Sequence, residues 1–369
     1  MYFKQWPFRV VPERVPDVWA DRKALYDRFS DLLSNFFLTR SSIFQCVWGY
    51  FGAGKSHTLL HFRNTMNKEG HFFLYGKLPK HIRSFLDFYR GGFIGLIDFL
   101  KLSQIAKEVY TSLGDESRLF DVAYREISDN WFDVAQVISI LARTTWTVKV
   151  TSDPYYALCR AWILGERLGK KELRFLGITK NIDNDQDAVR AMQVLLRLLT
   201  LKTQSQSARD TVILALDDCQ FFVELKDSDR KTIQQGLRDV FDGFPEGLCL
   251  LMSFTAGDAK KLKSFLIEDL QSRMKKDPIQ ISELSQSEAV DFITDLINSN
   301  KFKKEDAPDK FYPYTEESIS KAVDIVETVD QLTPRNLMSQ FDGLTSAAQR
   351  ELFPKRIDIK FVKKYFGRR

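Results

Sequence analysis

Residues 49–56 read Gly-Tyr-Phe-Gly-Ala-Gly-Lys-Ser, and this stretch decides the fold class of the 369-residue chain. It matches the pattern G-x-x-x-x-G-K-[S/T], in which glycines let the backbone wrap around phosphates with successive N–H groups pointing inward. The apolar run at 43–48 before it reads as a buried strand, and helical spacing resumes after it. The N-terminus of that helix would face the same phosphates. We therefore predict a phosphate-binding loop, called the phosphate loop below.

The phosphate loop predicts a nucleotide-binding site whose phosphate-binding and metal-binding residues are adjacent in sequence. Lys55 is expected to reach the β- and γ-phosphates, and Ser56 to ligate Mg²⁺, so the implied cofactors are ATP and Mg²⁺. The predicted nucleotide-binding residues of this segment are Gly49, Gly52, Ala53, Gly54, Lys55, Ser56 and His57. His57 and His61 are spaced as metal ligands can be on a helix, but no third ligand is evident, so packing is the better interpretation.

The rest of the chain alternates apolar runs with helical stretches. Further short strands are expected at 71–75, 211–216, 248–253 and 279–281, which favours an α/β core with a parallel sheet. The strand at 211–216 ends on two carboxylates, and Asp217 is placed to hold Mg²⁺ through water. A plain solvated loop is the alternative for this acidic pair.

The two motifs together resemble the AAA+ superfamily of P-loop ATPases, and the likeness covers most of the chain. In that superfamily a glutamate usually follows the first acid and polarises the attacking water. Asp218, one methylene shorter, implies ATP hydrolysis that is slow or that waits for a partner. The resemblance also implies a first sensor at Ser253 or Thr255, an arginine finger at Arg273 and a second sensor at Arg335. The implied catalytic residues are Lys55, Asp218, Arg273 and Arg335; the implied metal ligands are Ser56 and Asp217.

Within the superfamily the chain is similar to the origin-recognition-like branch, which includes DNA-loading initiators, transposition regulators and phage-defence ATPases. Residues 162–165 and 173–177 are similar to a segment of the ATPase of phage-exclusion systems. Two features depart from the branch. Asp217 lies much farther from the phosphate loop than in a minimal core, and only 34 residues follow Arg335, too few for the winged-helix domain that often ends initiators.

The expected architecture is a P-loop NTPase core with a parallel sheet, a large helical insertion and a C-terminal helical lid. Two helix starts in the lid are marked by Ser285, in a capping box, and by Thr333, ahead of a proline. The predicted limits are 1–82 for the first part of the α/β core with the phosphate loop, 83–205 for the insertion, 206–281 for the second part of the core, 282–350 for the lid, and 351–369 for a basic tail.

The net charge of +5 comes from the C-terminus. From Arg350 to Arg369 there are eight basic and two acidic residues, a net +6, so the remaining 349 residues sum to −1. Basic side chains between Lys355 and Arg369 could neutralise nucleic-acid phosphates. A solvated tail, or one docked on a neighbouring subunit, is the alternative.

The predicted function is an ATPase that uses ATP binding and hydrolysis to control assembly on DNA or on a DNA-acting partner, in phage-defence or mobile-element biology. The alternative is an ATP-dependent signalling or scaffold switch that contacts only proteins. A homo- or hetero-oligomer is expected when ATP is bound, along with other protein components. No apolar run approaches the ~20 residues of a membrane span, so we expect no membrane partner and a cytoplasmic location.

Overall fold

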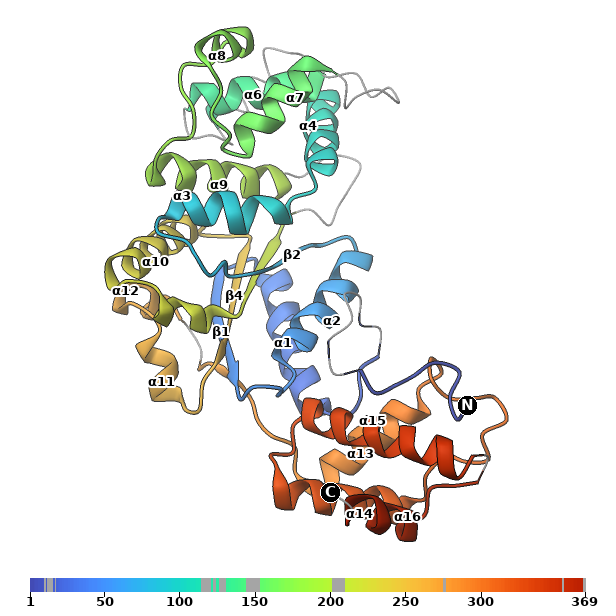
Figure 1. Ribbon diagram of the computed structural model, residues 1–369. Helices are drawn as coiled ribbons and strands as arrows, with labels where there is room; N and C mark the ends of the chain where they lie inside the picture. The colour runs from blue at the N-terminus through green and yellow to red at the C-terminus, as the bar shows by residue number, and fades with distance from the viewer. Residues whose placement is uncertain are drawn as a thin grey trace.

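A five-stranded parallel sheet forms the centre of the protein. The computed structural model describes residues 1–9, 11, 16, 18–113, 121, 124–125, 131–143, 153–200, 210–274, 277–353 and 355–367 (Figure 1). The strand order is β2-β3-β4-β1-β5. The strands are β1 (Ile43–Gly49), β2 (Phe72–Lys77), β3 (Val212–Asp217), β4 (Leu248–Thr255) and β5 (Ile279–Ile281). The predicted α/β class with a parallel sheet is confirmed.

Because the strands are parallel, their carboxyl ends meet at one edge, where ligands bind in sheets of this kind. The register pairs Gly49 with Thr255, and Lys77 with Asp217, at this edge. Strands β1 and β3 are buried along their whole length, which explains why they read as continuous apolar runs. The edge thus gathers the end of β1 and the two acids that end β3.

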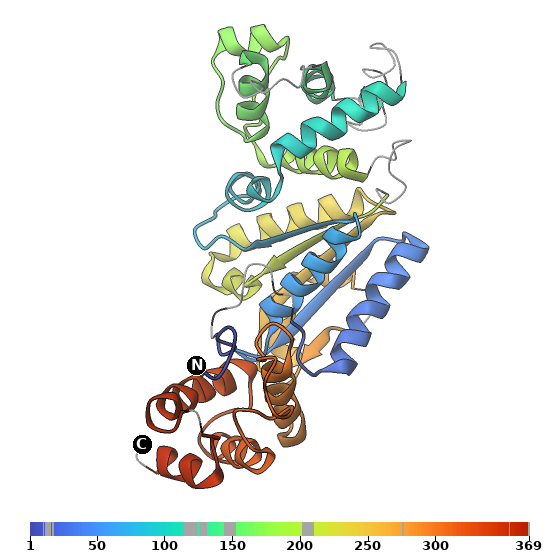
Figure 2. The same cartoon turned by 90° about the vertical axis from the view of Figure 1, so that its right-hand side faces the viewer.

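Helices cover both faces of the sheet. On one face α1 (Lys23–Thr39) and α2 (Lys55–Lys68) pack through a cluster that includes Phe29, Phe36 and Phe62. The opposite face carries α3 (Phe85–Phe88), α9 (Asp185–Thr200), α10 (Asp227–Asp242) and α12 (Glu268–Gln271) (Figures 1 and 2). The short helices η5 (Cys219–Glu224) and α11 (Ala259–Ser264) follow β3 and β4. The sheet is therefore the middle layer of three.

The predicted helical insertion lies between β2 and β3. Besides α3 and α9 it contains η1 (Tyr89–Phe93), η2 (Ile94–Leu96), α4 (Phe99–Leu113), α6 (Phe132–Arg143), α7 (Pro154–Ile163) and α8 (Lys170–Leu176). Its buried side chains, Leu102 and Trp162 among them, belong to the same cluster as Leu214 and Leu250 of the sheet. Trp162 donates from Nε1 to the carbonyl of Lys180 at 2.9 Å, so this motif residue has a packing role. The expected limit at 205 lies outside the described residues.

The C-terminal helices form a separate lid at the opposite end of the molecule from the insertion (Figure 2). They are α13 (Gln286–Asn298), α14 (Glu316–Val329), α15 (Pro334–Glu351) and α16 (Ile359–Phe366). Ser285 caps α13 in a capping box, and Thr333 caps α15 with a proline in its first turn. Both predicted helix starts are confirmed. No helix among the described residues is long and apolar enough to cross a bilayer.

The segment expected to be a basic tail folds into the lid instead. Ile357 and Val362 are fully buried in the lid core, and the amide of Ile357 donates to the carbonyl of Pro313 at 2.9 Å. Arg356 pairs with Asp309, and Lys364 pairs with Glu351. Arg368 and Arg369 lie outside the described residues. Residues 355–367 are therefore part of this chain's own lid, which corrects the expectation of a solvated tail.

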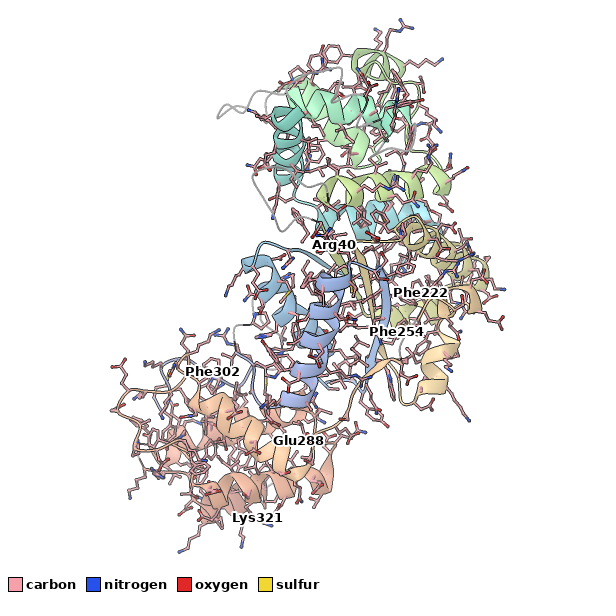
Figure 3. All side chains as sticks on the ribbon, turned by 180° about the vertical axis from the view of Figure 1, so that it is seen from behind. Arg40, Phe222, Phe254, Glu288, Phe302 and Lys321 are labelled. Atoms are coloured by element: carbon pink, nitrogen blue, oxygen red, sulfur yellow. The ribbon has the colours of Figure 1, made fainter. Side chains whose placement is uncertain are left out.

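The first residues of the chain also pack on the lid, although they were expected with the α/β core. Tyr2, Phe3 and Phe8 are buried in the lid core. The Tyr2 hydroxyl donates to the carbonyl of Lys355 at 2.7 Å, and Trp6 Nε1 donates to Asp342 at 2.6 Å. The backbone of Lys4 donates to the carbonyl of Phe302, which is labelled in Figure 3. The two ends of the sequence thus share one hydrophobic core.

Candidate functional site

The phosphate loop runs from the end of β1 to the first residue of α2. Gly52 and Gly54 have φ of 82° and 103°, in the left-handed region that glycine occupies without steric cost. At Gly49 the constraint is space, since a Cβ there would lie 2.3 Å from the carbonyl oxygen of Ile281. The 14-residue helix α2 begins at Lys55, so its N-terminus faces the loop. This geometry fits an anion of the phosphate type.

Lys55 is held against the loop backbone. Its side chain is largely buried, and Nζ donates to the carbonyls of Gly49 at 3.0 Å and Tyr50 at 2.8 Å. Burial lowers the pKa of Lys55 to about 8, the charge of Arg335 adds to the lowering, and Asp217 and Asp218 oppose it. Lys55 forms no ion pair in the part of the chain that is described. A buried ammonium without a paired carboxylate is suited to receive an anionic ligand.

Asp217 is the centre of the hydrogen-bond network at the sheet edge. Its Oδ2 accepts from the hydroxyls of Ser56 at 2.5 Å and Tyr75 at 2.7 Å. Its Oδ1 accepts from the Ser253 hydroxyl and from the backbone of Asp218. The structure thus brings together the two predicted metal ligands. A hydroxyl and a carboxylate side by side are oxygen donors of the kind that Mg²⁺ prefers.

Asp218 has a different set of partners from Asp217. It has a left-handed φ of 57°, and its Oδ2 pairs with Lys77 Nζ at 2.7 Å. Oδ1 accepts from Gln220 Nε2 at 3.3 Å, and the side-chain oxygen Oε1 of Gln220 accepts from the backbone N–H of Thr255 at 3.1 Å. The hydrogen bond to Asp218 raises the pKa of Lys77. The two candidate sensors are therefore tied to different acids, Ser253 to Asp217 and Thr255 through Gln220 to Asp218.

Arg335 reaches the phosphate loop from the lid. It lies in the first turn of α15, and its backbone N–H makes a long contact of 3.4 Å with the Gly52 carbonyl. Its guanidinium carbon lies 4.2 Å from the centre of the Phe51 ring. The structure therefore places Lys55, Ser56, Asp217, Asp218 and Arg335 around one edge of the sheet.

Two solved structures from Aeropyrum pernix resemble this chain. The ORC2 protein in ADPNP–ADP complexes superposes with a TM-score of 0.53 at 11% identity, covering 100% of this chain and 72% of that one. The ORC1 protein in complex with DNA gives a TM-score of 0.50 at 12% identity, covering 99% of this chain and 69% of that one. This chain has the fold of the origin-recognition-like AAA+ P-loop ATPases. No protein-family model and no curated protein sequence matches it.

One implied site residue of the AAA+ fold is not among the described contacts of the phosphate loop. Arg273 makes a bidentate pair with Asp242 of α10, with Nε 2.7 Å from Oδ1 and Nη2 2.8 Å from Oδ2. The pair lies on the exposed surface where α10 meets the end of α12. A role for Arg273 at an ATP site thus depends on a neighbouring subunit and stays a prediction.

The histidines beside the phosphate loop pack against aromatic rings. His57 and His61 stack with ring centres 6.2 Å apart, and Trp19 lies 6.0 and 5.1 Å from their respective centres. The described residues contain no group of three potential metal ligands. Packing is therefore the role that the structure supports for this pair.

Sequence reasoning missed Arg22, which joins the loop to the lid side of the molecule. Its two Nη atoms donate to the carbonyls of Ala53 at 2.7 Å and Ser282 at 2.6 Å. Burial lowers the pKa of Arg22 to about 10, and Glu288 opposes the shift. Glu288 lies at the end of the lid that faces the core (Figure 3).

Asp21 and Arg22 both have left-handed φ, and no motif in the sequence marks them. Tyr75, Lys77 and Phe51 were missed as well.

Proposed function

We propose that this chain is an ATPase that binds Mg-ATP at the phosphate loop. The contact between Ser56 and Asp217, beside the buried Lys55, carries the proposal. Lys55 would neutralise the β- and γ-phosphates, while Ser56 and Asp217 would hold the metal ion. Bound Mg²⁺ would offset the charge that develops on the phosphates. Arg335 would contribute a second cation from the lid, so that lid position and nucleotide state become linked.

Hydrolysis by this site is proposed to be slow or partner-stimulated. Asp218 is the carboxylate that would polarise the attacking water, but it is paired with Lys77. A carboxylate engaged by an ammonium is a weaker hydrogen-bond acceptor for water than a free one. A partner that moves the end of β2, where the insertion begins, would act on this pair directly.

The proposed output is assembly on DNA or on a DNA-acting partner, controlled by ATP, in phage-defence or mobile-element biology. The fold supports it, since the similar ORC1 structure is of a complex with DNA. Arg273 would act on the ATP of a neighbouring subunit of a homo- or hetero-oligomer, exchanging Asp242 for the γ-phosphate. Arginine suits this role because its guanidinium binds phosphate in a bidentate manner.

A second candidate, a switch that contacts only proteins, is favoured by the packing of the C-terminal segment. Residues 282–350 contain thirteen acidic and seven basic residues, a net charge of −6. The basic residues of 355–367 are attached to this acidic lid, and two of them are paired with its acids or with Glu351. The surface available to a polyanion is therefore less basic than the C-terminal sequence alone indicates.

A salt titration of duplex-DNA binding separates the two candidates. The full chain is tested with a slowly hydrolysed ATP analogue, beside a Lys360→Glu, Lys363→Glu variant that keeps the buried side of α16 intact. A Lys68→Glu, Lys171→Glu variant, with the same change of charge at two exposed positions outside the lid, is the matched control. The DNA function predicts affinity that falls steeply with salt and weakens in the α16 variant only. No DNA binding at low salt, with ATP-analogue binding intact, would support the protein-only switch instead.

A further inference from the structure

Phe51 is an exposed aromatic ring within the phosphate loop. The residue is 69% exposed, so burial in a core does not explain it. The contact that the structure gives this ring is with a cation, because the Arg335 guanidinium carbon lies 4.2 Å from the ring centre. Arginine over the face of an aromatic ring within ~6 Å is a favourable electrostatic arrangement.

The backbone of Arg335 is already fixed against the same loop. A Cβ added at Gly52 would lie 2.9 Å from the Cβ of Arg335 and 3.1 Å from the Thr333 hydroxyl oxygen, so the first turn of α15 rests directly on the loop. The contact between the Arg335 amide and the Gly52 carbonyl lies at the same point. The backbone of Arg335 is therefore positioned by its packing on the loop, and its guanidinium is positioned by the contact with the Phe51 ring.

The positive charges around this contact favour an aromatic ring at position 51. Arg335 forms no ion pair among the residues that the structure describes. Its charge acts unfavourably on both Lys55 and Lys77. The pKa of Lys55 is lowered, chiefly by burial, whereas the hydrogen bond to Asp218 keeps the pKa of Lys77 raised, and only Lys77 has a paired carboxylate. Two cations, Lys55 and Arg335, therefore face the loop without a paired acid. The face of the Phe51 ring carries negative electrostatic potential and attracts the guanidinium. Without the ring, a carboxylate or a phosphate would have to supply this attraction.

We propose that Phe51 is a positioning residue that holds the guanidinium of Arg335 at the phosphate loop before nucleotide binds. This inference rests on the proposed function, and it adds that the lid arginine is preorganised by the loop itself. A side chain that is already placed loses less conformational freedom when the ligand arrives, so binding is tighter. Given the strength of exposed cation–π contacts, loss of the ring should weaken ATP binding about two- to fivefold.

A double-mutant cycle tests the proposal on the full chain, with Mg-ATP affinity measured by calorimetry. Phe51→Leu should weaken binding, while Phe51→Trp should restore or exceed the affinity of the natural chain, because Trp is the best ring for a cation. In an Arg335→Gln background, Phe51→Leu should have no further effect. Phe175→Leu, which replaces another exposed phenylalanine, located in the insertion, should leave affinity unchanged.

The positioning role would be overturned if Phe51→Leu lowered Mg-ATP affinity equally in the natural chain and in the Arg335→Gln background. Tighter binding in the Phe51→Leu single variant would overturn it as well. If affinity depends on Lys55 while the two substitutions are additive, the proposed ATP site stands and this inference alone fails. If the natural chain binds no ATP, or Lys55→Ala binds it equally well, the proposed function itself fails. Circular dichroism of each variant checks that the fold is retained, and the Trp and Leu variants share the same site and exposure.

Discussion

The ion pair between Lys77 and Asp218 predicts that the proposed ATP hydrolysis is restrained by the chain's own side chains. The Lys77 side chain is 64% exposed and Asp218 is 26% exposed, so the pair is screened by solvent. Pairs of this kind contribute about 0.2–1 kcal/mol. If that free energy holds Asp218 away from the attacking water, its removal should raise the hydrolysis rate by about 1.4- to 5-fold.

Lys77→Met is the informative change, because it removes the charge and keeps most of the side-chain volume. The turnover number at saturating Mg-ATP should rise by that factor, while the affinity for ATP stays close to that of the natural chain. Lys77→Arg keeps a cation opposite Asp218 and should change the rate little. Asp218→Asn in the Lys77→Met background should remove the gain. A turnover number that is unchanged or lower in Lys77→Met, with normal ATP affinity, would refute the restraint.

Three further predictions follow from the site and the lid. The pKa of Lys55 is about 8, and its protonated form binds phosphate. ATP affinity measured by calorimetry should therefore be constant below pH 7.5 and fall by up to about tenfold per pH unit above pH 8. The Lys55→Arg variant should show no such fall. Tyr75→Phe removes a donor from the buried Asp217 and should cost about 1–3 kcal/mol of unfolding free energy in denaturant titrations, unlike Tyr26→Phe. Val362→Ala should cost about 1–3 kcal/mol, and the neighbouring exposed Lys363→Ala almost nothing, if α16 is part of the lid.

Local sequence signals predicted most of the fold because they coincide with local physical constraints. Parallel strands covered on both faces need continuous apolar residues, so β1 and β3 could be located within one or two residues. The caps at Ser285 and Thr333 mark helix starts through hydrogen bonds within one turn. The C-terminal segment was wrongly predicted to be a basic tail because its charge was given more weight than the positions of its apolar residues. Phe361 and Val362 lie on the buried side of α16, and Ile357, just before that helix, is buried as well.

The site was predictable where parallel strands force residues together. The loop after β1 and the acids after β3 must meet at the carboxyl edge, which is why Ser56 and Asp217 could be paired in advance. Lys77 was missed because its contact with Asp218 depends on the neighbouring position of β2 and β3 in the sheet order. Arg22 depends on the path of the chain between lid and core, for which the sequence carries no local signal.

The affinity of Lys55→Ala for Mg-ATP, measured by calorimetry, is the most direct test of the central claim that this loop is a nucleotide site. Lys68→Ala, an exposed lysine in the last turn of the same helix, is the matched control. We predict that the natural chain and Lys68→Ala bind Mg-ATP with equal affinity, while Lys55→Ala shows no measurable binding. Equal affinity in all three proteins would contradict it.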